Sequence, residues 1–512
     1  MKLVEDASTY RNPIIDADVP DPDAIRVGDR FYLVASSFHR APGLPIFASD
    51  DLVNWTRISY ALERNEPAAW FALTRHGGGV WAPSIRHHDG TFFVVYPDPD
   101  QGIFVVTAED PAGPWSPPRL LLAGLGLIDP CPLWDVDGST YLVHGWARSR
   151  SGRKNVLTVV PVDEKLSETR GVAVDVIDGA RLDGFTTLEG PKFYQRDGEY
   201  WIFAPAGGVA TGFQAVFRSD SPYGPYEHRI VLEQGDTPVN GPHQGAWVDD
   251  GEGGDWFLHF QDRGVYGRVL HLQPMAWGED GWPVMGQAVA GGPAQPVLEY
   301  PSLHGAPQGM RTLARSDDFA DGIPSANWQW EADPDPDAVV RRDHDAWTER
   351  ALTLRGSADG GNVRTLSRVL SQPLPGQPSS SRVDIELVSG RPGDRAGIAV
   401  LGYTYVWAGV RIGADGPEAV VAVRERDDQA ERVHLRVPIT AARAVVALDV
   451  DADARVRVGL TADGGRIDID PLFQAIEGHW VGAAVSLFAA SRHGAGEALA
   501  RFRDFGITMG DA

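Results

Sequence analysis

Short apolar runs joined by tight turns recur along the first 280 residues. The clearest case is residues 188–203, where an apolar run ends at Asp197-Gly198 and a second apolar run follows at once. An Asp-Gly pair between two apolar runs is a strong β-hairpin signal. Four further units share this layout, and the prolines that lead the five units are Pro22, Pro83, Pro130, Pro191 and Pro242.

Units that repeat about every 50 residues are typical of a β-propeller, in which each unit forms one blade. One such unit cannot bury both of its faces alone, whereas five units closed in a ring can, and closure also removes exposed strand edges. The pattern therefore predicts a five-bladed β-propeller, which occupies residues 1–300.

The pattern of apolar and polar positions changes after a Gly/Pro-rich stretch. This stretch runs from about residue 290 into a predicted linker at 301–315. Residues 316–512 contain short runs such as 383–387, 420–424 and 445–450, and several of these alternate apolar and polar positions as half-buried strands do. We expect this part to be a jelly-roll-like β-sandwich, so that the whole chain is all-β.

Composition narrows the choice of partners. The 512 residues carry a net charge of −24 with a pI near 4.9, which argues against nucleic acid and favours a small neutral or cationic ligand. Residues 1–6 contain no apolar stretch of a signal peptide, and no run is long enough to span a membrane. A cytoplasmic protein is the expectation, and the sequence leaves homo-oligomerisation open.

The candidate catalytic residues lie where the predicted blades begin. The residues just before the leading prolines include three carboxylates, Asp21, Asp129 and Glu189. The first strand of each blade lines the central channel, so residues at one end of these strands converge. Any one of them is explained by turn chemistry, because Asp-Pro and Asp-Gly pairs are common in solvated turns. Three at equivalent positions of a repeat indicate a shared site, in which at least one pKa should rise.

Paired carboxylates suit glycoside hydrolysis, in which one acid protonates the leaving oxygen and one carboxylate activates water or attacks carbon. The aromatic residues Phe38, Trp81 and Trp146 lie near the blade starts and could stack on a sugar ring. Packing between blades is the alternative explanation for all three.

Several motifs together resemble glycoside hydrolase family 43, the five-bladed propeller enzymes that act as β-xylosidases and α-L-arabinofuranosidases. The matching stretches are Asn12-Pro13-Ile14-Ile15, Pro20-Asp21-Pro22-Asp23, Ser36-Ser37-Phe38, residues 42–47 and 51–55, Gly78–Ser84 with Trp81 and Ala82, Ile128-Asp129-Pro130 and Glu189-Gly190-Pro191. The C-terminal part resembles the sandwich of the xylosidase branch, where it helps to wall the active site.

The resemblance implies an exo-acting, inverting enzyme that releases terminal β-D-xylosyl or α-L-arabinofuranosyl residues from oligosaccharides derived from hemicellulose. Asp21 would be the general base, Glu189 the general acid, and Asp129 would orient the acid and raise its pKa. A non-catalytic sugar-binding propeller and an endo-acting arabinanase are the alternatives. The intact carboxylate set argues against the first, and the appended sandwich argues against the second.

Further roles follow from the same resemblance. Phe38, Trp81, Ala82, Trp146 and Arg268 would contact the sugar. His243, in Gly241-Pro242-His243-Gln244-Gly245, matches the family's axial histidine, which lies near a bound ion or water cluster. A structural Ca²⁺ on the propeller axis, held indirectly by His243, is therefore an expectation, and no cofactor is expected for the chemistry.

Two stretches depart from the family's pattern. Lys192 follows the Glu189-Gly190-Pro191 motif where typical xylosidases carry histidine, and His39-Arg40-Ala41 follows Phe38 where aromatic and acidic residues are commoner. We expect both stretches on the leaving-group side of the site, so the leaving group and the preferred pentose stay open.

Overall fold

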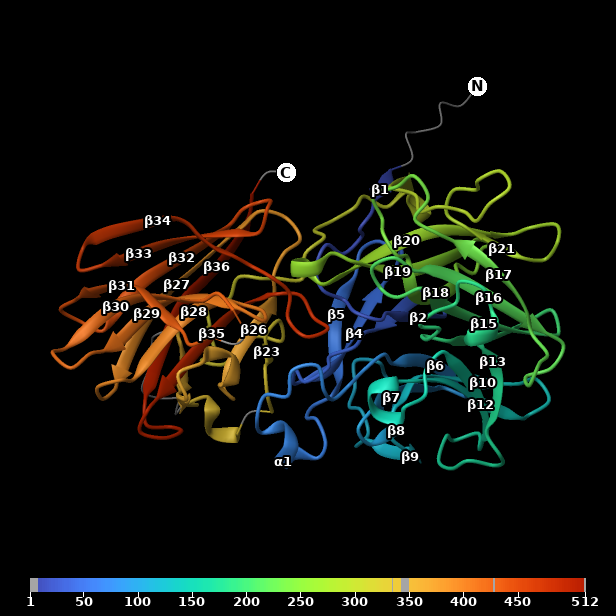
Figure 1. Ribbon diagram of the computed structural model, residues 1–512, viewed down its shortest axis with the longest axis horizontal. Coiled ribbons are helices and arrows are strands. Elements are labelled where there is room, and N and C mark those ends of the chain that lie inside the picture. The colour runs from blue at the N-terminus through green and yellow to red at the C-terminus, as the bar shows by residue number, and fades with distance from the viewer. Residues whose placement is uncertain (1–7, 334, 342–349, 427–428, 511–512) are drawn as a thin grey trace, which may run out of the picture.

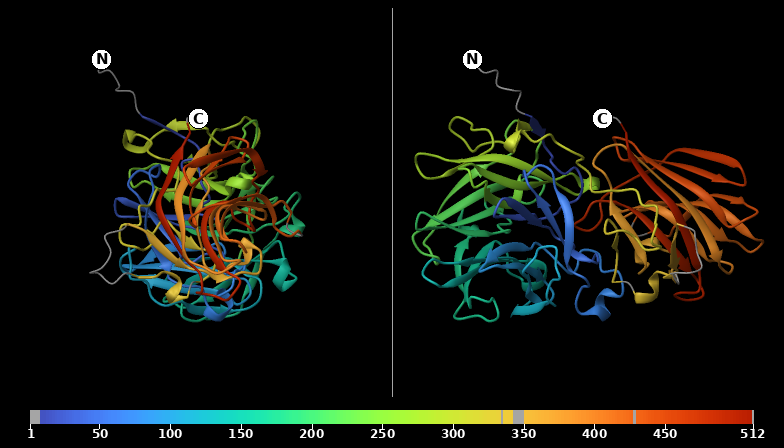
Figure 2. Two further views of the ribbon diagram at one scale, coloured as in Figure 1. Left: turned by 90° about the vertical axis from the view of Figure 1, so that its left-hand side faces the viewer. Right: turned by 180° about the vertical axis from the view of Figure 1, so that it is seen from behind.

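The computed structural model describes residues 8–333, 335–341, 350–426 and 429–510, which form two all-β bodies side by side (Figure 1). The expectation about the N-terminal residues 1–6 lies outside this part of the chain. Figure 2 shows the same two bodies from behind and from one end. The N-terminal body is the propeller and the C-terminal body is the sandwich.

The propeller has five blades, each a four-stranded antiparallel sheet with its strands in chain order. The blades are β2 (Asp23–Val27), β3 (Arg30–Val34), β4 (Gly43–Ser49) and β5 (Thr56–Leu62); β6 (Ser84–His88), β7 (Thr91–Asp98), β8 (Gly102–Ala108) and β9 (Arg119–Ala123); β10 (Leu127–Trp134), β11 (Thr140–Trp146), β12 (Val156–Val162) and β13 (Val174–Asp178); β14 (Lys192–Arg196), β15 (Glu199–Ala206), β16 (Phe213–Ser219) and β17 (Glu227–Leu232); and β18 (His243–Asp249), β19 (Asp255–Asp262), β20 (Arg268–Trp277) and β21 (Pro283–Met285).

Two of the predicted Asp-Gly pairs form tight turns between the first two strands of their blades. Asp89 and Gly90 have φ angles of 46° and 74°, and Asp197 and Gly198 have φ angles of 53° and 83°. Positive φ at both central residues defines the tight turn that matches the twist of the two flanking strands, and Asp-Gly tolerates it best. The five-bladed fold predicted from these hairpins is confirmed.

The N-terminal segment closes the ring by running along the last blade. The Ile14 and Val19 amides donate to the Leu270 and Arg268 carbonyls, each at 2.8 Å. Farther out, β1 (Thr9–Arg11) pairs with β22 (Glu299–Pro301), so Pro301 belongs to a strand although it begins the predicted linker. The domain limits 1–300, 301–315 and 316–512 stay predictions.

The C-terminal body consists of two antiparallel-rich sheets that face each other across one apolar core. One sheet has the order β23-β26-β35-β28-β29-β30-β31, with β25 beside β35, and the other has the order β24-β36-β27-β32-β33-β34. Their bounds are β23 (Gln329–Trp330), β24 (Leu352–Arg355), β25 (Ser357–Ala358), β26 (Val369–Pro373), β27 (Ser379–Ser389), β28 (Arg395–Leu401), β29 (Tyr405–Ile412), β30 (Pro417–Arg424), β31 (Arg432–Pro438), β32 (Arg443–Val450), β33 (Arg455–Ala462), β34 (Gly465–Gln474), β35 (Ala484–Ser491) and β36 (Leu499–Met509). The predicted β-sandwich is confirmed.

Contacts between the two bodies fix the sandwich against the mouth of the propeller. The Gly482 amide donates to Asp18 Oδ2 at 3.0 Å, and the Ala483 amide donates to the Val265 carbonyl at 2.7 Å. These bonds hold the loop that precedes β35 against the last blade.

Helix is scarce throughout the described residues. The two α-helices are α1 (Ala68–Phe71) and α2 (Arg148–Ser151), each a single turn, and neither is long or apolar enough to cross a membrane. Five 3₁₀ turns complete the regular structure at Gly179–Arg181, Gly264–Tyr266, Leu303–Gly305, Pro336–Ala338 and Val363–Thr365.

Candidate active site

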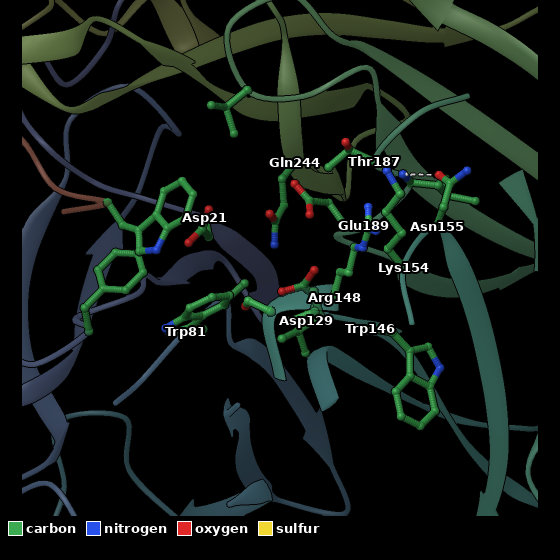
Figure 3. A pocket seen from close by; sticks show the side chains of 18 of the residues that line it. Asp21, Trp81, Asp129, Trp146, Arg148, Lys154, Asn155, Thr187, Glu189 and Gln244 are labelled. Atoms are coloured by element: carbon green, nitrogen blue, oxygen red, sulfur yellow. Dashed lines mark hydrogen bonds between the residues drawn. The ribbon is translucent and has the colours of Figure 1, made fainter. Parts of the chain in front are cut away.

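A cavity of about 220 Å³ opens at the mouth of the propeller, where the first strands of several blades begin (Figure 3). It brings together all eight residues that the sequence predicts as catalytic or sugar-binding. These are Asp21, Phe38, Trp81, Ala82, Asp129, Trp146, Glu189 and Arg268.

A recurring backbone conformation aims the carboxylates into this cavity. Asp21, Asp129 and Gly190, which precede the leading prolines of three blades, have φ angles of 54°, 56° and 59°. This left-handed region is strained for most side chains, although Asp tolerates it better than most. In the fourth blade glycine takes the strained position, so the carboxylate, Glu189, stands one residue earlier.

Asp21 is held by two donors. Arg268 Nη1 donates to its Oδ1 and Ser36 Oγ donates to its Oδ2, each at 2.5 Å. All three side chains are buried. The guanidinium and the hydroxyl together fix the orientation of the Asp21 carboxyl group in the cavity wall.

Asp129 lies in an environment that favours its protonated form. Burial, with the nearby negative charges of Glu189 and Asp21, raises the pKa of Asp129 from 3.8 to about 8, against the opposing hydrogen bond from the Gly190 amide to Oδ2 at 2.8 Å. The predicted rise in at least one pKa is therefore confirmed. At neutral pH the site retains a proton beside Glu189.

Glu189 is the most accessible of the three carboxylates, with 27% of its side chain exposed. Its Oε1 lies 3.2 Å from Nε2 of His243, within hydrogen-bonding distance. His243 itself is fully buried behind the cavity and does not line it. Its contact with Glu189 fixes the carboxyl group from the channel side.

The aromatic residues form opposite walls. Phe38 and Trp81 meet edge to face at a centroid distance of 6.5 Å, and the Trp81 indole N–H donates to the Gly77 carbonyl at 2.8 Å. Trp146 lies across the cavity, where its indole N–H donates to Thr158 Oγ1 at 2.8 Å (Figure 3). The predicted aromatic residues thus present ring surface while their polar atoms are satisfied elsewhere.

The sandwich contributes one wall of the cavity, as the family resemblance implies, but the sequence did not identify the residue that forms it. Trp480, in the loop before β35, comes from the sandwich and lines the same cavity, where its ring lies 6.1 Å from that of Trp81 in an edge-to-face arrangement. Its φ of 66° is a left-handed conformation rare for a bulky residue, and such strain persists where the surrounding structure enforces it.

Sequence reasoning also missed several polar and apolar residues of the lining. They are Ile128, Ala147, Arg148, Ser149, Lys154, Asn155, Thr187, Leu188, Val209 and Gln244. The available signal was the cluster of basic residues at 148–154 in an acidic chain that is poor in lysine.

The expectation for Lys192 is wrong. Its side chain is fully buried in the channel, where Nζ donates to the Pro83 carbonyl and to Ser84 Oγ, each at 2.8 Å, and lies 3.8 Å from Asp23 Oδ2. Register directs this side chain across the channel to two other blades, away from the cavity, so it does not contribute to the leaving-group side.

The expectation for His39-Arg40-Ala41 is also wrong. His39 Nε2 and Arg40 Nε contact the two oxygens of Glu331, at 2.8 Å and 3.1 Å, and Ala41 exchanges backbone hydrogen bonds with Trp330. Glu331 and Trp330 belong to the sandwich. This stretch therefore joins the two bodies and does not line the cavity.

The expected axial ion can be compared with the donors near His243. Ca²⁺ prefers six to eight oxygen ligands. His243 offers nitrogen atoms, with Nε2 directed at Glu189, and the ammonium of Lys192 already takes channel oxygens from Pro83 and Ser84. Within the described residues, the clusters with metal-ligand spacing are His39-His76-Glu331 and His88-Asp89-Glu164, and neither includes His243. These donors do not suit direct binding of Ca²⁺ by His243, and an ion held indirectly, as expected from the sequence, stays a prediction.

Comparisons with known proteins agree with this geometry. The family described as "Glycosyl hydrolases family 43" matches residues 10–283, and the "Beta xylosidase C-terminal Concanavalin A-like domain" matches residues 316–508. A "Putative beta-xylosidase" of Xylanibacter ruminicola is 39% identical over 382 residues, which cover 74% of this chain and 68% of that protein. A "Non-reducing end alpha-L-arabinofuranosidase" of Bacteroides ovatus is 35% identical over 315 residues, which cover 58% of this chain and 56% of that protein.

A solved structure supports the fold over almost the whole chain. The "xylan beta-1,4-xylosidase from Bacillus Halodurans" has a TM-score of 0.83 at 22% identity, with 97% of this chain and 99% of that chain covered. The match includes both bodies, as the two family matches do. The chain belongs to glycosyl hydrolase family 43.

Proposed function

We propose that the protein is an exo-acting, inverting glycoside hydrolase that releases terminal β-D-xylosyl or α-L-arabinofuranosyl residues from hemicellulose-derived oligosaccharides. One observation carries the proposal: the same cavity holds Asp21 paired with Arg268 and Asp129 with a pKa raised to about 8. Glu189 lines the same cavity, so a base candidate, an acid candidate and a carboxyl group with a raised pKa lie together, as glycoside hydrolysis requires. The names of the relatives support the pentose.

In the proposed reaction, Asp21 accepts a proton from a water molecule while the water oxygen bonds to the anomeric carbon. The bond between that carbon and the leaving oxygen breaks on the opposite face, and the leaving oxygen takes a proton from Glu189. Because the pKa of Asp129 is raised to about 8, its carboxyl group keeps a proton close to Glu189 at neutral pH. His243 positions Glu189.

The wall made by Trp480 supports exo action. The sandwich covers one side of the cavity, and Trp480 meets Trp81 across it. A walled pocket accommodates a chain end better than the middle of a long polymer, which argues against an endo-acting arabinanase. A sugar-binding propeller would have no use for the Arg268–Asp21 pair beside a protonated carboxyl group.

The side chains named above account for every proton transfer in the proposed reaction, and no step of it runs through a metal ion.

The cytoplasmic location and homo-oligomerisation stay predictions.

The test is a side-by-side assay on 4-nitrophenyl β-D-xyloside and 4-nitrophenyl α-L-arabinofuranoside. We expect hydrolysis of at least one, with kcat/KM reduced at least a hundredfold in Asp21→Asn. Absence of hydrolysis of both substrates by the folded protein would overturn the proposal.

A further inference from the structure

Four basic residues gather in one short segment at the edge of the cavity. Arg148, Arg150, Arg153 and Lys154 lie within seven positions, in a chain whose net charge is −24. The segment follows β11 and includes the single turn α2. Such a local excess of positive charge is unexpected on so acidic a surface.

Only part of this charge is neutralised by the protein. Arg150 pairs with Asp100 at 3.1 Å and Arg153 pairs with Asp175 at 2.7 Å. Arg148 and Lys154 form no ion pair with any acidic side chain in the part of the chain that the structure describes. Both are exposed, and both line the cavity.

These two cations lie on the side of Glu189. Figure 3 shows Arg148 and Lys154 beside Glu189, whereas Asp21 and Trp81 lie across the cavity. The general acid protonates the leaving oxygen, so groups on its side of the cavity face the leaving portion of the substrate.

The catalytic carboxylates do not require these cations. Asp21 already has Arg268 and Ser36 as donors, Glu189 has His243, and Asp129 has the Gly190 amide. A guanidinium and an ammonium that are exposed, unpaired and directed at a binding cavity are suited to an anionic group of the ligand.

We propose that the leaving-group side of the cavity binds a carboxylate through Arg148 and Lys154, so that the preferred substrates carry a uronic acid next to the scissile bond. This inference rests on the proposed function, and it specifies the class of leaving group. At physiological salt, charges farther away than a Debye length of about 8 Å are largely screened. The acidic surface at a distance therefore repels a bound carboxylate less than the two adjacent cations attract it.

The test compares two aryl pentosides of the sugar that the enzyme hydrolyses faster. One has a 3-carboxylatophenyl leaving group and the other the neutral 3-carboxamidophenyl group, which has nearly the same size. We expect the carboxylate to be favoured about fivefold in kcat/KM, as for two surface ion pairs, and the ratio to fall toward one in 1 M NaCl.

The variant Arg148→Gln/Lys154→Gln should reduce the carboxylate-to-carboxamide ratio to about one. Lys165→Gln/Arg170→Gln is the matched control, because it removes the same charge from exposed positions of the same blade outside the cavity lining. That control should keep the ratio of the unmodified protein. A second pair of substrates, xylotriose and its glucuronate-bearing analogue, tests the preference on a natural linkage, and a galacturonate-bearing analogue identifies which uronate is favoured.

Equal kcat/KM for the two aryl pentosides, or a preference that survives in the double variant, would overturn the inference and leave the proposed function intact. Failure of the folded protein to hydrolyse both nitrophenyl pentosides would overturn the proposed function, and the inference with it.

Discussion

Arg268 donates a hydrogen bond to Asp21 at 2.5 Å, although the two residues lie 247 positions apart in the chain. Ring closure creates this contact, since the N-terminal segment runs along β20, which begins at Arg268. The guanidinium also lies 5.9 Å from the ring of Phe38, so it occupies the space between the base and an aromatic wall.

Replacement of Arg268 by lysine should therefore impair catalysis. We expect kcat/KM to fall about a hundredfold for Arg268→Lys, because an ammonium cannot reproduce the planar contact with Asp21 and the neighbouring rings. Arg263→Lys is a matched control: Arg263 pairs with Asp16 near the same end of the last blade but does not line the cavity. Activity of Arg268→Lys within threefold of the unmodified protein would show that Asp21 needs no guanidinium.

The role of Glu189 can be separated from that of Asp21 by the leaving group. A general acid contributes about 10²–10⁴-fold, and most where the departing alcohol is poor. Glu189→Ala should lose that factor on xylo- or arabino-oligosaccharides yet keep much of the rate on dinitrophenyl glycosides, measured as kcat/KM. Equal losses on both kinds of substrate would exclude Glu189 as the acid.

Asp129 makes stability depend on pH. Its pKa is about 8 in the folded state and near 3.8 when unfolded, so the unfolded chain ionises first as pH rises. The stability present below pH 4 is lost progressively up to about pH 8, where the loss is on the order of 5 kcal/mol. Asp129→Asn removes this penalty, so its melting temperature should exceed that of the unmodified protein by about 5 °C at pH 8 and by much less at pH 4.

Asp137→Asn provides the control, because Asp137 is an exposed turn residue outside the cavity. It should leave the pH dependence of the melting temperature unchanged. If Asp129→Asn gained no more stability at pH 8 than at pH 4, a protonated Asp129 in the folded protein would be refuted.

Because Trp480 of the sandwich lines the cavity, its removal should weaken substrate binding. Trp480→Ala should raise KM for pentosides about tenfold with little change in melting temperature, since its side chain is 42% exposed and contributes little to the core. Trp70→Ala is a matched control, because Trp70 is 43% exposed and does not line the cavity. An unchanged KM for Trp480→Ala would remove the sandwich from the substrate site.

The repeat made much of this site predictable. Asp21, Asp129 and Glu189 were recognisable because equivalent positions of successive blades must converge, and the structure brings them into one cavity. The turn explanation was not a true alternative, since the left-handed conformation of Asp21 and Asp129 is itself what aims the carboxylates.

Features that depend on packing between distant segments were not predictable. Trp480 reaches the cavity only because the sandwich docks on the propeller, and no local pattern marks it. Lys192 and His39 were recognised as unusual, but their directions depend on strand register and on a sandwich residue, Glu331. Lys154 is one of few lysines in the chain, but only the structure shows that its side chain lines the cavity.

The central claim is that water activated by Asp21 attacks in a single displacement. Proton NMR of the sugar first released from a β-D-xyloside, or from an α-L-arabinofuranoside if that is the better substrate, tests it most directly. The account predicts that the anomer of opposite configuration forms first, α-xylose from the β-xyloside, and only then equilibrates. Initial formation of the anomer with the substrate's own configuration would show a covalent intermediate and contradict the account.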